Sequence, residues 1–141
     1  APVKGEALKI IPKNYSIRDH IWGSANIFPL DEAGKIFYAG STYEWNFKDE
    51  FPTQEKREEL INKIRKTIFS TFEIVEHVSG VRPAMADRRP VMGLIPESRI
   101  GLFNGFGTKG FSLAPYFSKV FCGYLAESNS LPDSVNLKRF Q

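Results

Sequence analysis

The sequence predicts an α+β fold, built from a mainly antiparallel β-sheet and two principal helices. Segments that alternate like strands precede a segment with helical periodicity, and the same order recurs in the second half of the chain. The 12 phenylalanines supply the wide apolar surfaces that a sheet and its covering helices share. With 141 residues, the chain is expected to form a single domain over residues 1–141.

Two strands and a hairpin are expected first. Residues 4–11 alternate loosely between apolar and polar side chains, and Pro12 ends the run because proline lacks the N–H that a sheet ladder needs. Residues 17–22 form a second, shorter candidate strand. Residues 25–29 and 35–42 then flank a short segment that contains Asp and Gly, which predicts a β-hairpin.

The clearest helix follows the hairpin, over residues 53–69. Thr53 is the expected N-cap, and Glu55 lies in the first turn, where the helix dipole favours negative charge. Four apolar residues recur at helical spacing and predict one buried stripe: Leu60, Ile61, Ile64 and Ile68. Residues 72–78 predict a further strand, which continues toward Arg82.

After Arg82 the sequence predicts a turn, a strand that runs to Gly93 and another over residues 100–103. A second helix is expected over residues 113–125. Five of its apolar side chains are expected on one side: Leu113, Phe117, Val120, Phe121 and Leu125. Cys122 lies in the same apolar run and is expected to be buried. The tail from Leu131 shows no clear period.

Composition and charge exclude several kinds of protein. The net charge of +3 is not gathered into a basic stripe, so nucleic-acid binding is not favoured. No apolar run approaches the roughly 20 residues that span a bilayer, so no membrane span is expected. The single cysteine excludes an internal disulfide and agrees with a reducing compartment, so a cytoplasmic location is expected. His20 and His77 lack partners at metal-ligand spacing, so no metal site is expected.

A glycine-rich segment, residues 105–110, directly precedes the second predicted helix. Glycines let the backbone approach a ligand closely, and the N–H groups at a helix start favour negative charge. The segment therefore suits an anionic part of a cofactor, and a simple connection is the alternative. It lacks the βαβ context of a dinucleotide fingerprint and the Gly-Lys-Ser/Thr ending of a phosphate-binding loop, so nucleotide hydrolysis is excluded.

Arg82 lies between a predicted strand and Pro83. An arginine on a rigid strand binds a carboxylate through two parallel hydrogen bonds, which fixes the orientation of the carboxylate. A surface salt bridge is the alternative for this residue. Ser112 lacks the flanking residues of a nucleophile elbow, so Ser-His-Asp catalysis is not expected, and no other catalytic side chain is assigned.

Several short motifs occur in a fixed order along the chain. They are Pro2-Val3-Lys4-Gly5-Glu6, Ile27-Phe28-Pro29, Ala39-Gly40-Ser41-Thr42, Gly80-Val81-Arg82-Pro83, and the glycine-rich segment followed by Leu113-Ala114-Pro115. Together they resemble the C-terminal part of the D-amino-acid oxidase and glycine oxidase superfamily of FAD-dependent oxidoreductases. The resemblance spans nearly the whole chain. It implies the fold of the substrate-binding domain, followed by the loop and helix that contact the flavin.

The resemblance also implies roles for individual residues. Arg82 matches the arginine that pairs with the substrate carboxylate, and Asn26 and Tyr43 fall where side chains project into the active site. The loop that contacts the isoalloxazine end of FAD is matched by Gly105, Phe106, Gly107, Thr108, Lys109 and Gly110. In such enzymes the flavin takes a hydride from the carbon beside the amine, so the expected substrate is a small amine or amino acid.

The chain departs from the glycine oxidase pattern in three ways. Phe106 stands where glycine oxidases often have a histidine, and Asn26 replaces a substrate-contacting tyrosine, so the substrate need not be glycine. The N-terminal dinucleotide-binding domain, with its Gly-x-Gly-x-x-Gly motif, is absent from this chain. We therefore expect an inactive fragment that binds FAD weakly or not at all and self-associates through exposed aromatic surface.

Two alternatives stay open from the sequence. Members of the same superfamily that act on a modified base of transfer RNA carry a similar arginine strand and terminal loop, and their substrate is also a carboxylated amine. The other alternative is a stand-alone module that kept the fold, lost the cofactor and uses Arg82 to bind an anion.

Overall fold

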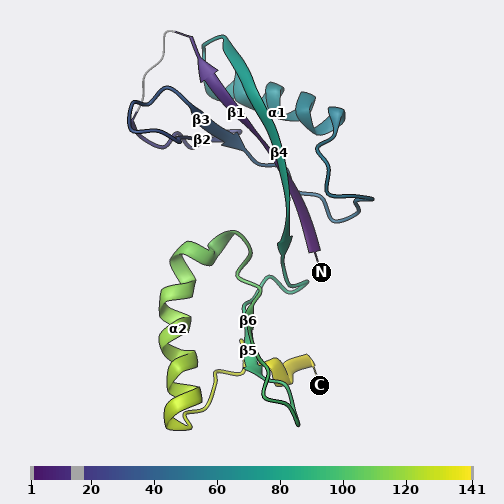
Figure 1. Ribbon diagram of the computed structural model, residues 1–141, viewed down its shortest axis with the longest axis vertical. Coiled ribbons are helices and arrows are strands. Elements are labelled where there is room, and N and C mark those ends of the chain that lie inside the picture. Colours follow the sequence, from purple (N-terminus) through teal and green to yellow (C-terminus); the bar gives the residue numbers. More distant parts are fainter. Residues whose placement is uncertain (1, 14–17, 141) are drawn as a thin grey trace. The chain divides into compact units, whose positions relative to one another are not determined.

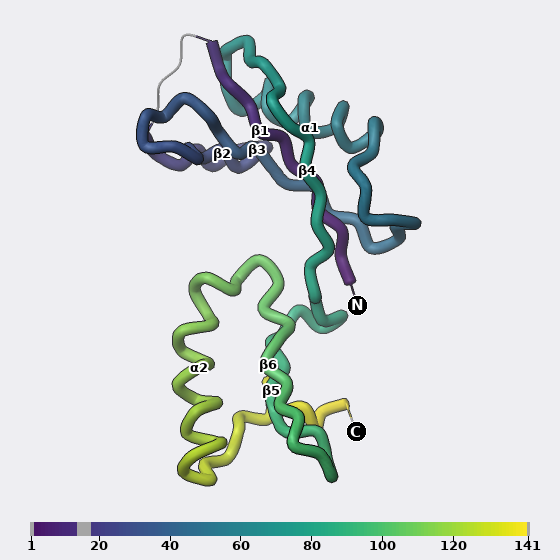
Figure 2. The backbone as a smooth tube through the Cα atoms, viewed as in Figure 1, coloured from purple at the N-terminus to yellow at the C-terminus, as the bar shows by residue number. Residues whose placement is uncertain are grey.

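The computed structural model describes residues 2–13 and 18–140 and confirms the predicted α+β class (Figure 1). The chain divides into two compact units. The first runs from Val3 to Val81, and the second comprises Pro2 and the chain from Arg82 onward. Figure 2 traces the first unit from purple to teal and the second from green to yellow. Each unit has its own sheet and one long helix.

The first unit holds a four-stranded sheet in the order β2-β3-β1-β4. Its strands are β1 (Pro2–Pro12), β2 (Asn26–Pro29), β3 (Phe37–Gly40) and β4 (Phe72–Pro83). β3 pairs antiparallel with both β2 and β1, which confirms the predicted hairpin. Asp31 shapes the hairpin turn, because its Oδ1 accepts the main-chain N–H groups of Lys35 and Ile36, each at 2.9 Å.

The helix α1 (Gln54–Thr67) covers one face of this sheet (Figure 1). The Oγ1 atom of Thr53 accepts the N–H of Lys56 at 3.3 Å, which confirms the predicted N-cap. The core between helix and sheet consists of Leu8, Ile10, Ala25, Ile27, Phe37, Ala39, Leu60, Ile64 and Ile68, with Ile61 packed against it. The predicted apolar stripe of the helix is therefore confirmed.

The prediction of a strand at residues 17–22 is wrong for residues 18–22. Ile17 lies outside the described residues. Among residues 18–22, Ile21 alone pairs with another segment, exchanging main-chain hydrogen bonds of 2.7 and 2.9 Å with Ile27. Trp22 is 80% exposed, so the apolar residues here do not form the buried face that sustains a strand.

The second unit contains a two-stranded antiparallel sheet of β5 (Val91–Leu94) and β6 (Gly101–Asn104), followed by α2 (Gly110–Glu127). The predicted strand and helix are confirmed, and the helix begins earlier than expected, inside the glycine-rich segment. The core of the second unit consists of Met92, Leu131 and Val135. The partly buried side chains that pack against it are Phe103, Phe106, Phe117, Val120, Phe121 and Tyr124. The tail without a sequence period therefore completes the core, and it ends in a 3-10 turn at Leu137–Phe140.

Two expectations about α2 are wrong, and the helical repeat explains both. Successive residues of a helix are rotated by about 100°, which places Leu125 about 120° away from Leu113 and Tyr124 only about 20° away. Leu125 is accordingly 52% exposed, whereas Tyr124 packs on the core. Cys122, about 180° from Leu113, is exposed instead of buried. Within the described residues, neither helix is long and apolar enough to cross a membrane.

Candidate functional site

Arg82 lies on β4, next to the last residue of the strand, and it opens the second unit. Two residues later, the buried Ala84 forms bridges with Gly105 and Phe106, at the start of the glycine-rich segment. The structure therefore places the predicted carboxylate-binding arginine and the predicted cofactor loop on adjacent stretches of backbone within one unit. Arg82 is half-buried and has interaction partners of its own.

The backbone of the glycine-rich segment requires glycine at its first position. Gly105 has a φ of 81°, and a Cβ there would lie 2.5 Å from Cγ of Met85 and 3.2 Å from the carbonyl oxygen of Arg89. Its N–H donates to Oδ1 of Asn104 at 2.8 Å. Gly107 has a φ of 55°, but a Cβ there would meet no atom within 4 Å. Gly105 thus serves close packing, and Gly107 leaves open space beside the backbone.

The segment leads into α2 through a 3-10 turn at Gly107–Lys109. The N-cap residue of α2, Lys109, makes no side-chain capping hydrogen bond, and its own N–H donates to the carbonyl oxygen of Phe106 at 3.0 Å. Phe106 turns its ring into the unit, with ring centroids 4.8 Å from Phe103 and 6.3 Å from Phe117. Phe106 is therefore a packing residue, while the helix start and Gly107 offer main-chain groups.

Asn26 and Tyr43 lie in the first unit. Asn26 opens β2 and pairs across the hairpin with Gly40, the last residue of β3. Tyr43 lies three positions after Gly40, and its two neighbours in the chain, Thr42 and Glu44, form hydrogen bonds with the backbone of β1. The N–H of Thr42 donates to the main-chain carbonyl oxygen of Glu6 at 3.0 Å, and the main chains of Glu44 and Lys4 exchange two hydrogen bonds of 2.9 Å. The Tyr43 ring is partly exposed and faces Trp45, with centroids 6.1 Å apart.

The predicted site residues thus form two groups, one in each unit. Asn26 and Tyr43 share the end of the hairpin in the first unit. Arg82 and the segment 105–110 share adjoining backbone in the second.

A buried polar cluster near this hairpin end was not predicted. Glu6 is 1% exposed, and both of its carboxylate oxygens have partners. Its Oε1 lies 3.1 Å from Nζ of Lys4 and accepts the hydroxyl of Thr53 at 3.2 Å. Its Oε2 accepts the N–H of Thr53 at 2.9 Å and lies 2.9 Å from Nε2 of His77. The carboxylate therefore joins β1 to β4 and to the start of α1.

The lysine of this cluster is as deeply buried as the carboxylate. Lys4 is 2% exposed, and its Nζ also donates to the carbonyl oxygen of Phe51. A sequence signal for both residues existed: Lys4 and Glu6 continue the two-residue alternation of Leu8 and Ile10, which face α1. Two oppositely charged residues that share the two-residue period of a buried strand face predict a buried ion pair.

His77 is the titratable member of the cluster whose environment is perturbed. Burial lowers the pKa of the His77 imidazole below its ordinary value of 6.5, and the positive charges of Arg57 and Lys4 act in the same direction. The negative charge of Glu6 opposes this effect. Among the described residues, Nε2 of His77 has no hydrogen-bond partner of normal geometry, so its contact with Glu6 is electrostatic.

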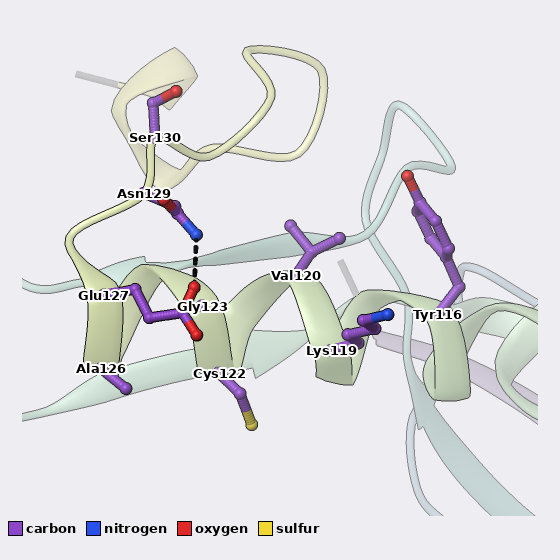
Figure 3. Close-up of a pocket in the computed structure, with 9 residues that line it drawn as sticks. All are labelled: Tyr116, Lys119, Val120, Cys122, Gly123, Ala126, Glu127, Asn129 and Ser130. Carbon is purple, nitrogen blue, oxygen red and sulfur yellow. Dashed lines mark hydrogen bonds between the residues drawn. The ribbon is translucent and has the colours of Figure 1, made fainter.

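A shallow pocket lies on the exposed side of α2 and contains none of the predicted site residues (Figure 3). Tyr116, Lys119 and Cys122 line it from the helix, and Asn129 closes its end. The N–H of Asn129 donates to the carbonyl of Gly123 at 3.3 Å, which fixes the turn after the helix. With walls from one helix and its following turn, the pocket is a surface groove and offers no convergent polar groups.

Comparisons with known proteins connect this arrangement to a family. The family model described as FAD dependent oxidoreductase matches residues 1–123. The fold is similar to that of iminodiacetate oxidase from Chelativorans sp. BNC1, with a TM-score of 0.73 and 20% identity over 100% of this chain. It is also similar to glycine oxidase from Geobacillus kaustophilus (TM-score 0.70) and L-proline dehydrogenase from P. horikoshii (0.72), each 22% identical over 92% of this chain.

The chain covers only 39% of that iminodiacetate oxidase and 36% of each of the other two proteins. At these identities the likeness concerns the fold, whereas the family match extends over most of the sequence. The chain belongs to the FAD-dependent oxidoreductase family.

Proposed function

We propose that this chain is the substrate-binding and flavin-capping part of an FAD-dependent oxidoreductase that oxidises a small amine or amino acid by hydride transfer to the flavin. The observation that supports it most is the pairing of Ala84 with Gly105 and Phe106, two residues from Arg82. In this proposal the first unit contributes the substrate-binding domain, and the second contributes the loop and helix that meet the flavin.

The second unit fits a flavin in two respects. Gly107 leaves room beside its backbone, and the first N–H groups of α2 favour the negative charge of a reduced flavin ring. We propose that the main chain of Gly105, Phe106, Gly107, Thr108, Lys109 and Gly110 forms this contact. FAD, when bound, supplies the hydride acceptor. The chain's own task is to hold the ring and to orient the substrate beside it.

Arg82, Asn26 and Tyr43 are the residues that we propose for the substrate. The guanidinium of Arg82 would receive the carboxylate in two parallel hydrogen bonds, which fixes which hydrogen of the neighbouring carbon faces the flavin. The amide of Asn26 and the hydroxyl of Tyr43 supply further polar groups from the end of the hairpin.

The proposed partner is an N-terminal FAD-binding domain of the parent protein, because the chain covers little more than a third of the similar oxidases. Phe111 of α2 is 99% exposed, and Leu125, on the same side of the helix, is also exposed. We propose that this apolar side of α2 packs on that domain, and that isolated copies self-associate through it. A cytoplasmic location completes the proposal, in agreement with the single cysteine.

The test uses the complete oxidase that contains this chain, purified with FAD. Under anaerobic conditions, an amino acid or amine should bleach the flavin absorbance. Arg82→Gln should lower kcat/KM for carboxylated amines by about 10- to 100-fold, because a charge-assisted bidentate contact contributes roughly 1.5–3 kcal/mol.

Arg99→Gln is the matched control, because Arg99 is an exposed arginine of the same unit. It should leave kcat/KM and the flavin spectrum unchanged. A complete protein that carries flavin but is reduced by no amine or amino acid would contradict the proposal. A complete protein that binds an anion at Arg82 and holds no flavin would support the cofactor-free module instead.

A further inference from the structure

The face of the first sheet that turns away from α1 carries a row of long side chains. In β2 and β3, Ile27, Phe37 and Ala39 belong to the core under α1. Because side chains alternate along a strand, Phe28 and Tyr38 project from the opposite face, as does Asn26. Figure 1 shows α1 on one side of this sheet only.

Phe28 and Tyr38 form a stacked pair on this face. They are direct partners in the antiparallel register, and their ring centroids lie 4.8 Å apart at an interplanar angle of 24°. His20 supports the pair from outside, with its ring 5.6 Å from Phe28 in an edge-on arrangement. An offset stack of this kind fixes the ring of Tyr38 more firmly than an aliphatic neighbour would.

Charges lie on the other side of Tyr38. Its register partner on β1 is Lys9, whose Nζ lies 2.6 Å from the carboxylate of Glu76 on β4. The row across the sheet is therefore Phe28, Tyr38, Lys9 and Glu76, with its charges paired at one end and its rings at the other.

The ring of Tyr38 leans from this row over Gly40, which lies between Asn26 on β2 and Ala7 on β1. A Cβ on Gly40, the register partner of Asn26, would lie 3.1 Å from Cε1 and 3.3 Å from the hydroxyl oxygen of Tyr38. The absence of a side chain at Gly40 is therefore what lets the ring extend over this position. Its hydroxyl end lies over the residue that pairs with Asn26.

We propose that Tyr38, backed by Phe28, is a specificity-determining residue that forms an apolar wall for the substituent of the substrate. The inference rests on the proposed function, in which Asn26 contacts the substrate. A substrate held at Asn26 meets the ring of Tyr38 on the same face of the sheet. An amino acid with a bulky apolar or aromatic side chain gains from this contact, whereas glycine has no substituent to place there.

The experiment measures a ratio in the complete, FAD-loaded oxidase: kcat/KM for phenylalanine over kcat/KM for glycine, with both enantiomers of phenylalanine tested. Tyr38→Leu should lower this ratio about three- to tenfold, the range expected for loss of an aromatic contact. Tyr38→Phe keeps the ring and should retain the wild-type ratio. Phe28→Leu removes the support of the ring and should shift the ratio in the same direction as Tyr38→Leu.

Phe69→Leu is the matched control, because Phe69 is a fully exposed phenylalanine outside the predicted site, and it should change nothing. If Tyr38→Leu and Phe28→Leu lower kcat/KM equally for both substrates, Tyr38 has only a structural role and the inference is overturned. If Tyr38→Leu fails to fold, Phe28→Leu decides between these results.

Failure of the inference is distinguishable from failure of the proposed function. A response to Arg82→Gln without any change of ratio at Tyr38 overturns the inference alone. A flavin that no amine or amino acid reduces overturns both.

Discussion

At the scale of single residues, the carboxylate of Glu6 holds three segments of the first unit together. It contacts Lys4, Thr53 and His77, which lie on β1, at the cap of α1 and on β4. A buried ion pair contributes little net stability, since desolvation offsets the attraction. Removal of one partner is nevertheless costly, because the other charge is left buried and unpaired.

Glu6→Gln should therefore lower the free energy of unfolding by about 3–5 kcal/mol, since Lys4 would keep its charge without its carboxylate partner. Urea denaturation followed by circular dichroism measures the change. Glu73→Gln, at an exposed position of β4, is the control and should have little effect. Equal midpoints for the two variants would show that the Glu6 charge does not stabilise the fold.

The second prediction at this scale concerns pH. The folded chain keeps His77 neutral at pH values where the unfolded chain already binds a proton, because burial lowers the folded pKa below 6.5. Stability should thus be highest above about pH 6.5 and should fall as the pH drops toward the folded pKa.

Urea midpoints compared between about pH 7.5 and about pH 5 test this direction. In His77→Gln the decline should become shallower, whereas His20→Gln should keep the wild-type slope, since His20 is exposed and lies outside the buried cluster. An unchanged slope in His77→Gln would assign the decline to other groups.

At the scale of elements, the turn into the glycine-rich segment depends on one residue. Gly105→Ala should lower the free energy of unfolding by about 1–3 kcal/mol, because alanine is strained at a φ of 81° and its Cβ would overlap Met85. Gly80→Ala is the matched control: a Cβ at Gly80 meets nothing within 4 Å, so stability should be retained or slightly raised. Thermal unfolding by calorimetry compares the two, and similar midpoints would contradict the requirement for glycine.

Elements whose signals are local could be predicted from the sequence. Thr53 and the stripe through Leu60 and Ile64 define α1 by capping and by periodicity, both of which act within a few residues. The burial of Leu131 and Val135 could not be predicted, because it depends on packing against Met92, about 40 positions away, and not on any local period.

The candidate site also has a part that the sequence predicts and a part that depends on tertiary contacts. Arg82 and residues 105–110 could be selected by residue type and order, but their proximity depends on the bridge at Ala84, which no spacing rule indicates. The stacked pair of Phe28 and Tyr38 was also not predicted. Its register follows from the hairpin, yet the lean of Tyr38 depends on free space at Gly40, which a sequence pattern does not express.

At the scale of the whole molecule, the chain covers 36% of the length of the similar glycine oxidase and 39% of that of the similar iminodiacetate oxidase. We expect the isolated chain to leave the fluorescence of added FAD unchanged at concentrations where the complete oxidase quenches it. The reason is that, in the proposed arrangement, residues 105–110 contact only one end of the cofactor. Retention of FAD through gel filtration by the isolated chain would contradict this.

The exposed apolar side of α2 leads to a further prediction for the isolated chain. Its sedimentation coefficient should rise with protein concentration, and Phe111→Ser with Leu125→Ser should reduce that rise, because both side chains are exposed. A concentration-independent monomer would count against self-association.

Cys122 gives the molecule a built-in chemical reporter. It is the single cysteine of the chain, and its thiol is exposed on α2, on the side of the helix away from Leu113. A thiol-reactive dye therefore labels one defined position without any engineering of this part of the protein. The labelling rate at Cys122 becomes a direct readout of how completely a neighbouring domain, or a second copy, shields this side of the helix.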